Sequence, residues 1–301
     1  MYEFNYSYKD FPKWQDSAEG MQILEGNPNN TKVSIWPLVE YDCRDDYHLH
    51  IRFMFPLEMD ESKRYPLIIH CKGSGWEKQN LESNLADFAP VVKAGYGLAF
   101  IQYRPANIAK YPAQVHDLKN AARYILNHAE QFPIDLNHVF LAGDSSGGHT
   151  AIMSYLTWGE PVLDEYDDPL PTLSGLIDYY GVTNVRKLAE TDTGMSKESN
   201  ALLLDFLFAE KTEAEFAQAN FACYIDLKEK LPPVLILHGN KDRLVPLSQS
   251  VEFFEALKAR GTDCQFYMVN NSDHGGCLFF CPAVTDTIIK FLRETVKTQF
   301  I

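Results

Sequence analysis

A series of short apolar runs, separated by longer amphipathic segments, limits the fold of this chain most strongly. Six such runs span residues 66–71, 97–103, 138–143, 174–180, 233–239 and 264–269. Strands that are apolar throughout are expected where helices cover both faces of a sheet. Strand–helix alternation of this kind is typical of an α/β fold with a mostly parallel central sheet and helices on both of its faces.

The segments around these runs support the same fold class. Residues 112–132, 248–261 and 283–298 carry apolar side chains at helical spacing. Residues 48–55 alternate between polar and apolar, which predicts an antiparallel strand with one buried face. The first 30 residues form an irregular lead-in without such a pattern.

One region interrupts the alternation. Residues 184–230 place about 45 residues, rich in Lys, Glu, Ala and Phe, between the fifth and sixth apolar runs. We expect a single domain over residues 1–301, in which 184–230 form a small helical lid over one end of the sheet. Ligands bind at the carboxyl ends of the strands in such sheets, where a lid would lie.

Composition excludes several classes of partner. The chain has 301 residues, with 27 basic and 41 acidic side chains and a net charge of −14. Such a charge repels phosphates and anionic lipids, so we expect neither nucleic acid nor membrane as a partner. The N-terminus lacks the pattern of a signal peptide, and the six cysteines form no dense framework. A cytoplasmic protein with reduced thiols follows.

Two groups of potential metal ligands are weak signals. Cys277 and Cys281 have C-x3-C spacing but no second pair of ligands with the spacing of a zinc site. His48 and His50 lie on one face of the expected strand and could share a metal, although a solvated strand face is the simpler interpretation. We therefore assign no metal.

A candidate nucleophile follows the third apolar run. Residues 143–147 read GDSSG and satisfy G-x-S-x-G, with a strand before them and a helix after them. The pattern selects Ser145, because small residues must stand two positions before and after a serine on so sharp a turn. Ser146 would instead offer its backbone N–H to a developing oxyanion. The simpler alternative is a glycine turn without catalysis.

A serine hydroxyl needs a base, and the base needs an acid. Asp242 and His274 each follow an apolar strand, in the order Ser, acid, His that hydrolases of this kind use. Both therefore belong at the same edge of the sheet as Ser145. Asp178, at the end of the fifth run, is the reserve candidate for the acid.

Three other residues are weaker candidates. His149 lies on the helix after Ser145, where packing or capping explains it, and His238 more simply orders the end of its strand. Asp273 adjoins His274 in sequence, so it cannot easily turn to face the same ring.

The loop after the first apolar run is a candidate for oxyanion binding. Its residues Gly73-Ser74-Gly75 can present backbone N–H groups to an oxyanion, although a plain glycine loop explains them too.

From about residue 46 onward the sequence resembles the α/β-hydrolase esterases of the hormone-sensitive-lipase-like and acetylxylan/feruloyl esterase kinds. The segments that carry the resemblance read YRPANIAKYPAQVHDLKNAARYI, GDSSGGHTA, LPPVLILHGNKDRLVP and SDHGG. It implies Ser145 as nucleophile, Asp242 as acid and His274 as base.

One segment departs from that family pattern. Members usually show a histidine and three glycines where this chain has Lys72-Gly73-Ser74-Gly75-Trp76. We assign the oxyanion hole to the N–H groups of Ser74, Gly75 and Ser146. The departure puts the class of substrate in doubt more than the chemistry.

The expected function is a serine carboxylesterase that hydrolyses short-chain acyl esters, such as acetylated sugars or small aromatic esters, without metal or organic cofactor. Two alternatives stay open: an exopeptidase or amidase of the same fold, and a binding protein that has lost catalysis. The expected partner is a small-molecule ester, and an exposed edge strand or the lid could support a homodimer.

Overall fold

The computed structural model describes residues 5–7, 10–27, 29–44, 46–58 and 62–298. Contacts divide the chain into two compact units, residues 1–30 and residues 31–301. The described residues of the first unit form no helix or strand. The second unit contains every element named below.

A nine-stranded sheet forms the centre of the second unit. Its strands run in the order β1-β3-β5-β4-β6-β7-β8-β9, with β2 paired to β3. The strands from β4 to β9 are parallel to one another, whereas β1 and β2 pair antiparallel with β3, and β3 pairs antiparallel with β5. The mostly parallel α/β sheet expected from the sequence is therefore confirmed.

The six apolar runs correspond to the six parallel strands. The strands are β1 (Lys32–Ile35), β2 (Val39–Arg44), β3 (Tyr47–Leu57), β4 (Tyr65–Cys71), β5 (Gly97–Ile101), β6 (Ile134–Asp144), β7 (Leu173–Tyr179), β8 (Val234–Gly239) and β9 (Cys264–Val269). The helices are α1 (Ala89–Lys93), α2 (Ala113–Asn127), α3 (Ser145–Leu156), α4 (Val185–Glu190), α5 (Lys197–Leu207), α6 (Glu213–Gln218), α7 (Leu247–Ala259) and α8 (Pro282–Thr298).

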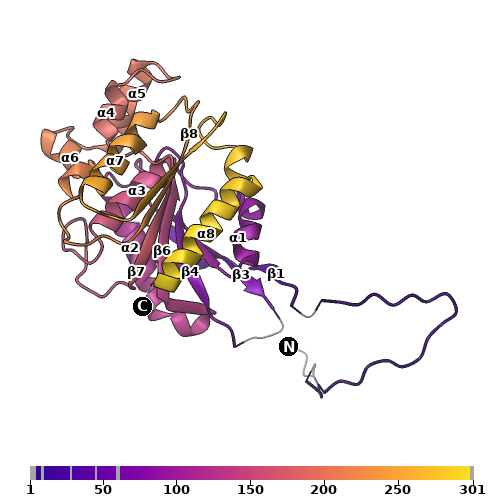
Figure 1. Cartoon of the computed structure of the whole chain (residues 1–301). Helices are drawn as coiled ribbons and strands as arrows, with labels where there is room; N and C mark the ends of the chain where they lie inside the picture. Colours follow the sequence, from indigo (N-terminus) through magenta and orange to yellow (C-terminus); the bar gives the residue numbers. More distant parts are fainter. Residues whose placement is uncertain (1–4, 8–9, 28, 45, 59–61, 299–301) are drawn as a thin grey trace. The chain divides into compact units, whose positions relative to one another are not determined.

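Helices cover both faces of this sheet (Figure 1). On one face α2, α3 and α7 bury their apolar sides in a core with Val115, Ile152 and Phe253. On the other face α1 and α8 pack around Val92 and Phe291. Burial on both faces is the reason that the inner parallel strands are apolar throughout, whereas the edge strand β9 leaves Tyr267 and Met268 exposed.

The sequence patterns did not reveal β1 and β2. β1 has only four residues, which is too short for a periodic signal. In β2 the pairing register with β3 shifts between Glu40 and Asp42, so Tyr41 is an extra residue, a β-bulge. The bulge breaks the two-residue alternation by which a half-buried strand is recognised. Within the described ranges, no helix is both long and apolar enough to cross a membrane.

Candidate active site

Ser145 lies at the junction of β6 and α3, where the chain turns sharply. Its φ angle is 55°, in the left-handed region that residues other than glycine rarely adopt. A Cβ atom on Gly143 would lie 2.3 Å from the carbonyl oxygen of Gly147, and one on Gly147 would lie 2.1 Å from that of Cys71. The turn therefore requires glycine at both positions, which is the steric reason for the G-x-S-x-G pattern.

His274 links the hydroxyl of Ser145 to the carboxylate of Asp242. Its Nε2 lies 2.8 Å from Ser145 Oγ, and its Nδ1 lies 2.8 Å from Asp242 Oδ2. Ser145 directly follows β6, and Asp242 and His274 lie in the loops after β8 and β9, as expected for parallel strands that end at one sheet edge. The structure thus brings together the three residues that the sequence singled out.

The surroundings of Asp242 keep it ionised. Its Oδ1 accepts hydrogen bonds from the backbone N–H groups of Leu244 and Val245, at 2.8 Å each. His238, fully buried, places its Nε2 3.2 Å from Oδ2. Burial alone would raise the pKa of Asp242, but hydrogen bonds from His238 and His274 hold it well below its usual range.

Two of the weaker candidates, Asp178 and His149, make their contacts elsewhere. Asp178 is fully buried, and its Oδ1 accepts a hydrogen bond from the N–H of Gly181 at 3.0 Å. Burial raises the pKa of Asp178 to about 7. His149 is fully buried, and its Nε2 lies 3.2 Å from the carbonyl oxygen of Ala219. Its role is therefore one of packing. None of these contacts involves His274.

Asp273 has a structural role that its sequence position did not reveal. Its Oδ1 accepts from the N–H of Arg243 at 3.0 Å, and its Oδ2 accepts from Arg243 Nε at 2.7 Å. The ion pair ties the loop of Asp242 to the loop of His274. As expected, Asp273 does not face the imidazole beside it.

The loop after β4 lies against Ser146. The backbone N–H of Ser74 donates to Ser146 Oγ at 2.9 Å, and Ser146 Oγ lies 3.2 Å from the hydroxyl of Tyr103. Lys72, at the place where family members carry histidine, is buried and donates through Nζ to the carbonyl oxygen and hydroxyl of Ser83, at 2.7 Å each. Lys72 thereby links this loop to Ser83.

A cavity of about 420 Å³ opens beside Ser145 and His274. Ser74, Gly75 and Ser146, the residues assigned to the oxyanion hole, also line it. Of the three residues of the hydrogen-bonded series, only Asp242 does not line the cavity. Four residues of the segment 184–230 also line it: Leu188, Met195, Asn200 and Leu203. The segment folds into α4, α5 and α6 and forms part of the cavity wall.

Two features of the site had no sequence signal. The ring of Tyr180 packs edge-on against that of His274, with 4.7 Å between centroids. His70 Nε2 lies 2.9 Å from Oδ1 of Asp144, the residue before Ser145. Both contacts join residues distant in sequence, and only the fold brings them together.

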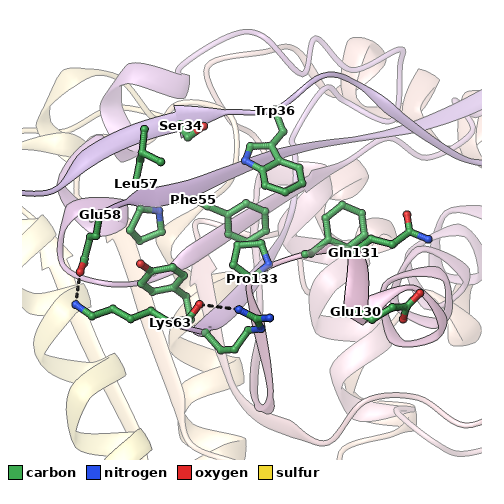
Figure 2. A pocket seen from close by; sticks show the side chains of 13 residues that line it. Ser34, Trp36, Phe55, Leu57, Glu58, Lys63, Glu130, Gln131 and Pro133 are labelled. Atoms are coloured by element: carbon green, nitrogen blue, oxygen red, sulfur yellow. Dashed lines mark hydrogen bonds and ion pairs between the residues drawn. The ribbon is translucent and has the colours of Figure 1, made fainter. Parts of the chain in front are cut away.

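A second cavity, of about 270 Å³, lies at the opposite end of the sheet, near the start of β4. Figure 2 shows the aromatic side chains of Trp36 and Phe55 in its wall, beside an ion pair between Glu58 and Lys63. Among the described residues that line this cavity there is no histidine or cysteine. The candidate site is the cavity beside Ser145, because Ser145 and His274 line it and lie within hydrogen-bond distance of each other.

Fold and geometry together define the class. A mostly parallel sheet with a serine on a strand–helix elbow, followed by an aspartate and a histidine on later loops, is the arrangement of an α/β-hydrolase. The BD-FAE family model matches residues 55–257, more than half of the chain. The chain belongs to the BD-FAE family, which confirms the resemblance expected from the sequence.

Two individual relatives share less than a quarter of their aligned residues with this chain. The chain is 23% identical over 215 residues to the probable carboxylic ester hydrolase LipM of Mycobacterium tuberculosis, covering 67% of this chain and 47% of that protein. It is 24% identical over 230 residues to an esterase of Gibberella moniliformis, covering 72% of this chain and 68% of that protein. The chain spans about half the length of the mycobacterial relatives it matches.

Solved structures share the fold. Esterase B of Lactobacillus rhamnosis, with a bound inhibitor, matches with a TM-score of 0.78 and 20% identity over 89% of this chain and 88% of that one. A truncated carbohydrate esterase from gut microbiota matches with a TM-score of 0.71 and 22% identity over 89% of this chain and 97% of that one.

Proposed function

We propose that the protein is a serine carboxylesterase that hydrolyses short-chain acyl esters through an acyl-enzyme. The hydrogen-bonded series from Ser145 through His274 to Asp242, with 2.8 Å at both contacts, carries the proposal. Membership of the BD-FAE family and relatives named as esterases support it.

Each residue of the series has one role in the proposed reaction. His274 Nε2 accepts the proton of Ser145 Oγ as this oxygen attacks the acyl carbonyl carbon. Asp242, held as a carboxylate, accepts the Nδ1–H of His274 and stabilises the imidazolium that forms. When the tetrahedral intermediate collapses, His274 returns the proton to the leaving alcohol. Water then attacks the acyl-enzyme by the same steps and releases the acid.

The oxyanion of the intermediate needs N–H donors. We assign Ser74, Gly75 and Ser146 to this role, since all three line the cavity next to Ser145. The N–H of Ser74 is shared with Ser146 Oγ, so Gly75 and Ser146 are the principal donors. We further propose that residues 184–230 act as a lid, because four of their side chains form the cavity wall.

Two rival functions make different predictions. An amidase or exopeptidase of this fold would turn over anilides at rates that approach those of the matching esters. A binding protein without catalysis would turn over neither and would leave Ser145 unlabelled by a fluorophosphonate.

The test combines covalent labelling with a panel of substrates. The full-length protein is treated with a fluorophosphonate probe, and turnover of p-nitrophenyl acetate, acetylated sugars and p-nitroanilides is measured. We expect one probe per chain on Ser145 and preference for esters, whereas Ser145→Ala abolishes both labelling and turnover. Labelling that persists in Ser145→Ala, or a preference for anilides, contradicts the proposal.

A further inference from the structure

A surface cluster of three different metal-ligating groups lies on the hairpin formed by β2 and β3. Cys43 pairs with His48 across the two strands, and Glu40 pairs with His50. In a regular strand Glu40 and Cys43, three residues apart, would point to opposite faces. The extra residue at Tyr41 brings them onto the same face, because a bulge shifts the alternation by one.

The ligand atoms of this cluster are already close. One carboxylate oxygen of Glu40, Sγ of Cys43 and one ring nitrogen of His48 all lie within 4.8 Å of one another. Nδ1 of His48 is 3.1 Å from Oε2 of Glu40. We propose that Glu40, Cys43 and His48 form a binding site for a divalent transition-metal ion such as Zn²⁺.

The distances and ligand types fit such an ion. Zinc binds thiolate at about 2.3 Å and imidazole or carboxylate at about 2.0 to 2.2 Å, so tetrahedral ligands lie roughly 3.3 to 3.8 Å apart. Only small side-chain movements are needed, and the side chains of His48 and Glu40 are 57% and 50% exposed. Water takes the fourth position. A thiolate with an imidazole selects zinc, cobalt or copper over magnesium and calcium, which prefer oxygen ligands.

The local charge favours a cation. The carboxylates of Glu40, Asp42 and Asp46 lie near the Cys43 thiol. The same carboxylates attract a divalent ion, which would displace the thiol proton on binding. The nearby guanidinium of Arg44 already pairs with Asp42, at 2.7 Å, and with Glu165, at 3.0 Å. The Arg44 guanidinium therefore repels a bound cation less than an unpaired guanidinium would.

This site is separate from the proposed esterase function. None of its three residues lines the cavity beside Ser145, and all three precede residue 55, where the match to the family model begins. From the sequence we paired His48 with His50, whereas the structure groups His48 with Glu40 and Cys43. A bound ion would cross-link β2 to β3, and within the described part of the chain β2 pairs with no other strand.

Cobalt tests the proposal, because a cysteine thiolate bound to Co²⁺ gives a charge-transfer absorption band. The full chain is stripped of metal under a non-chelating reductant and titrated with Co²⁺, then with Zn²⁺. We expect the band to saturate at one Co²⁺ per chain and to vanish when Zn²⁺ replaces it. Cys43→Ser should abolish the band, and His48→Asn or Glu40→Gln should weaken binding about 10-fold or more.

Cys223→Ser is the matched control, since Cys223 is also an exposed free thiol. It should bind Co²⁺ as the unmodified chain does, with the same band. The proposal is overturned if the unmodified chain shows no thiolate band, or if the band survives in Cys43→Ser. It is equally overturned if His48→Asn and Glu40→Gln both bind with unchanged affinity.

Discussion

The hydroxyl of Ser146 accepts a hydrogen bond from the backbone N–H of Ser74, with 2.9 Å between nitrogen and oxygen. The same hydroxyl lies 3.2 Å from the buried phenol of Tyr103, whose oxygen is also 3.0 Å from Ser74 Oγ. These contacts fix the loop after β4 against the start of α3. The side chain of Ser146 thus positions the loop, while we assign its backbone N–H to the proposed oxyanion hole.

The two adjacent serines should therefore differ greatly when they are replaced. We expect Ser145→Ala to lower kcat for p-nitrophenyl acetate by about 10⁴-fold or more, because the nucleophile is lost. Ser146→Ala should cost only about 10-fold, since one hydrogen bond that positions the loop is lost while the backbone N–H stays. Thermal melting of both variants checks that they fold. Equal losses of activity would show that the G-x-S-x-G pattern selects the wrong serine.

The acid should be identifiable by the same approach. Asp242→Asn leaves the shape of the side chain but removes the charge that stabilises the imidazolium, so kcat should fall by roughly 10⁴-fold. Asp178→Asn should retain most of the activity, because Asp178 accepts its hydrogen bond from the N–H of Gly181 and makes none with His274. Steady-state kinetics of both variants decide between them. Activity that survives in Asp242→Asn but is lost in Asp178→Asn would assign the acid to the end of β7.

Much of the fold was predictable because most of the parallel strands are buried on both faces. Such strands appear as unbroken apolar runs, and all six were visible as β4 to β9. The three residues of the proposed series were also visible, because each follows the end of such a strand. β2 was not predictable, since the bulge at Tyr41 hides its alternation.

Contacts between distant segments were beyond the reach of sequence patterns. The edge-on packing of Tyr180 on His274 and the ion pair of Arg243 with Asp273 depend on loop conformations that no short pattern encodes. The proposed donors of the oxyanion hole are backbone groups, whose direction depends on the path of the loop. Roles of the site residues, a cytoplasmic location and a homodimer stay predictions.

The buried carboxyl of Asp178 should make stability depend on pH. Its pKa is about 7 in the folded protein, compared with about 4 for an unfolded aspartate. The folded state therefore binds more protons between these values, and the free energy of unfolding falls as pH rises from about 4 through about 7. From pH 5 to pH 8 this loss should amount to about 2 to 3 kcal/mol, and Asp178→Asn should remove it.

Urea unfolding of both proteins across this pH range measures the effect. Asp286→Asn, at an exposed aspartate on α8, is the control and should lose stability as the unmodified chain does. If Asp178→Asn shows the same pH dependence as the unmodified chain, another group causes the loss of stability.

The wall that the segment 184–230 provides should limit the length of the acyl chain. The apolar residues of α5 differ in their environment: Leu203 lines the cavity, Leu207 is fully buried, and Leu202 is 63% exposed. A cavity of about 420 Å³ that also holds the alcohol leaves room for a short acyl group only. Each methylene that fits adds about 0.8 kcal/mol of burial, whereas one that does not fit meets packed side chains.

We therefore expect kcat/KM to be highest for acetyl to butyryl esters and much lower for decanoyl and longer esters. Leu203→Ala removes part of the wall and should shift the optimum toward longer chains. Leu202→Ala, at the exposed neighbour, should leave the profile unchanged. Specificity constants of p-nitrophenyl esters from acetyl to hexadecanoyl test this prediction. An optimum at decanoyl or beyond in the unmodified chain would show that the acyl group extends past Leu203 into an open tunnel, as in a lipase.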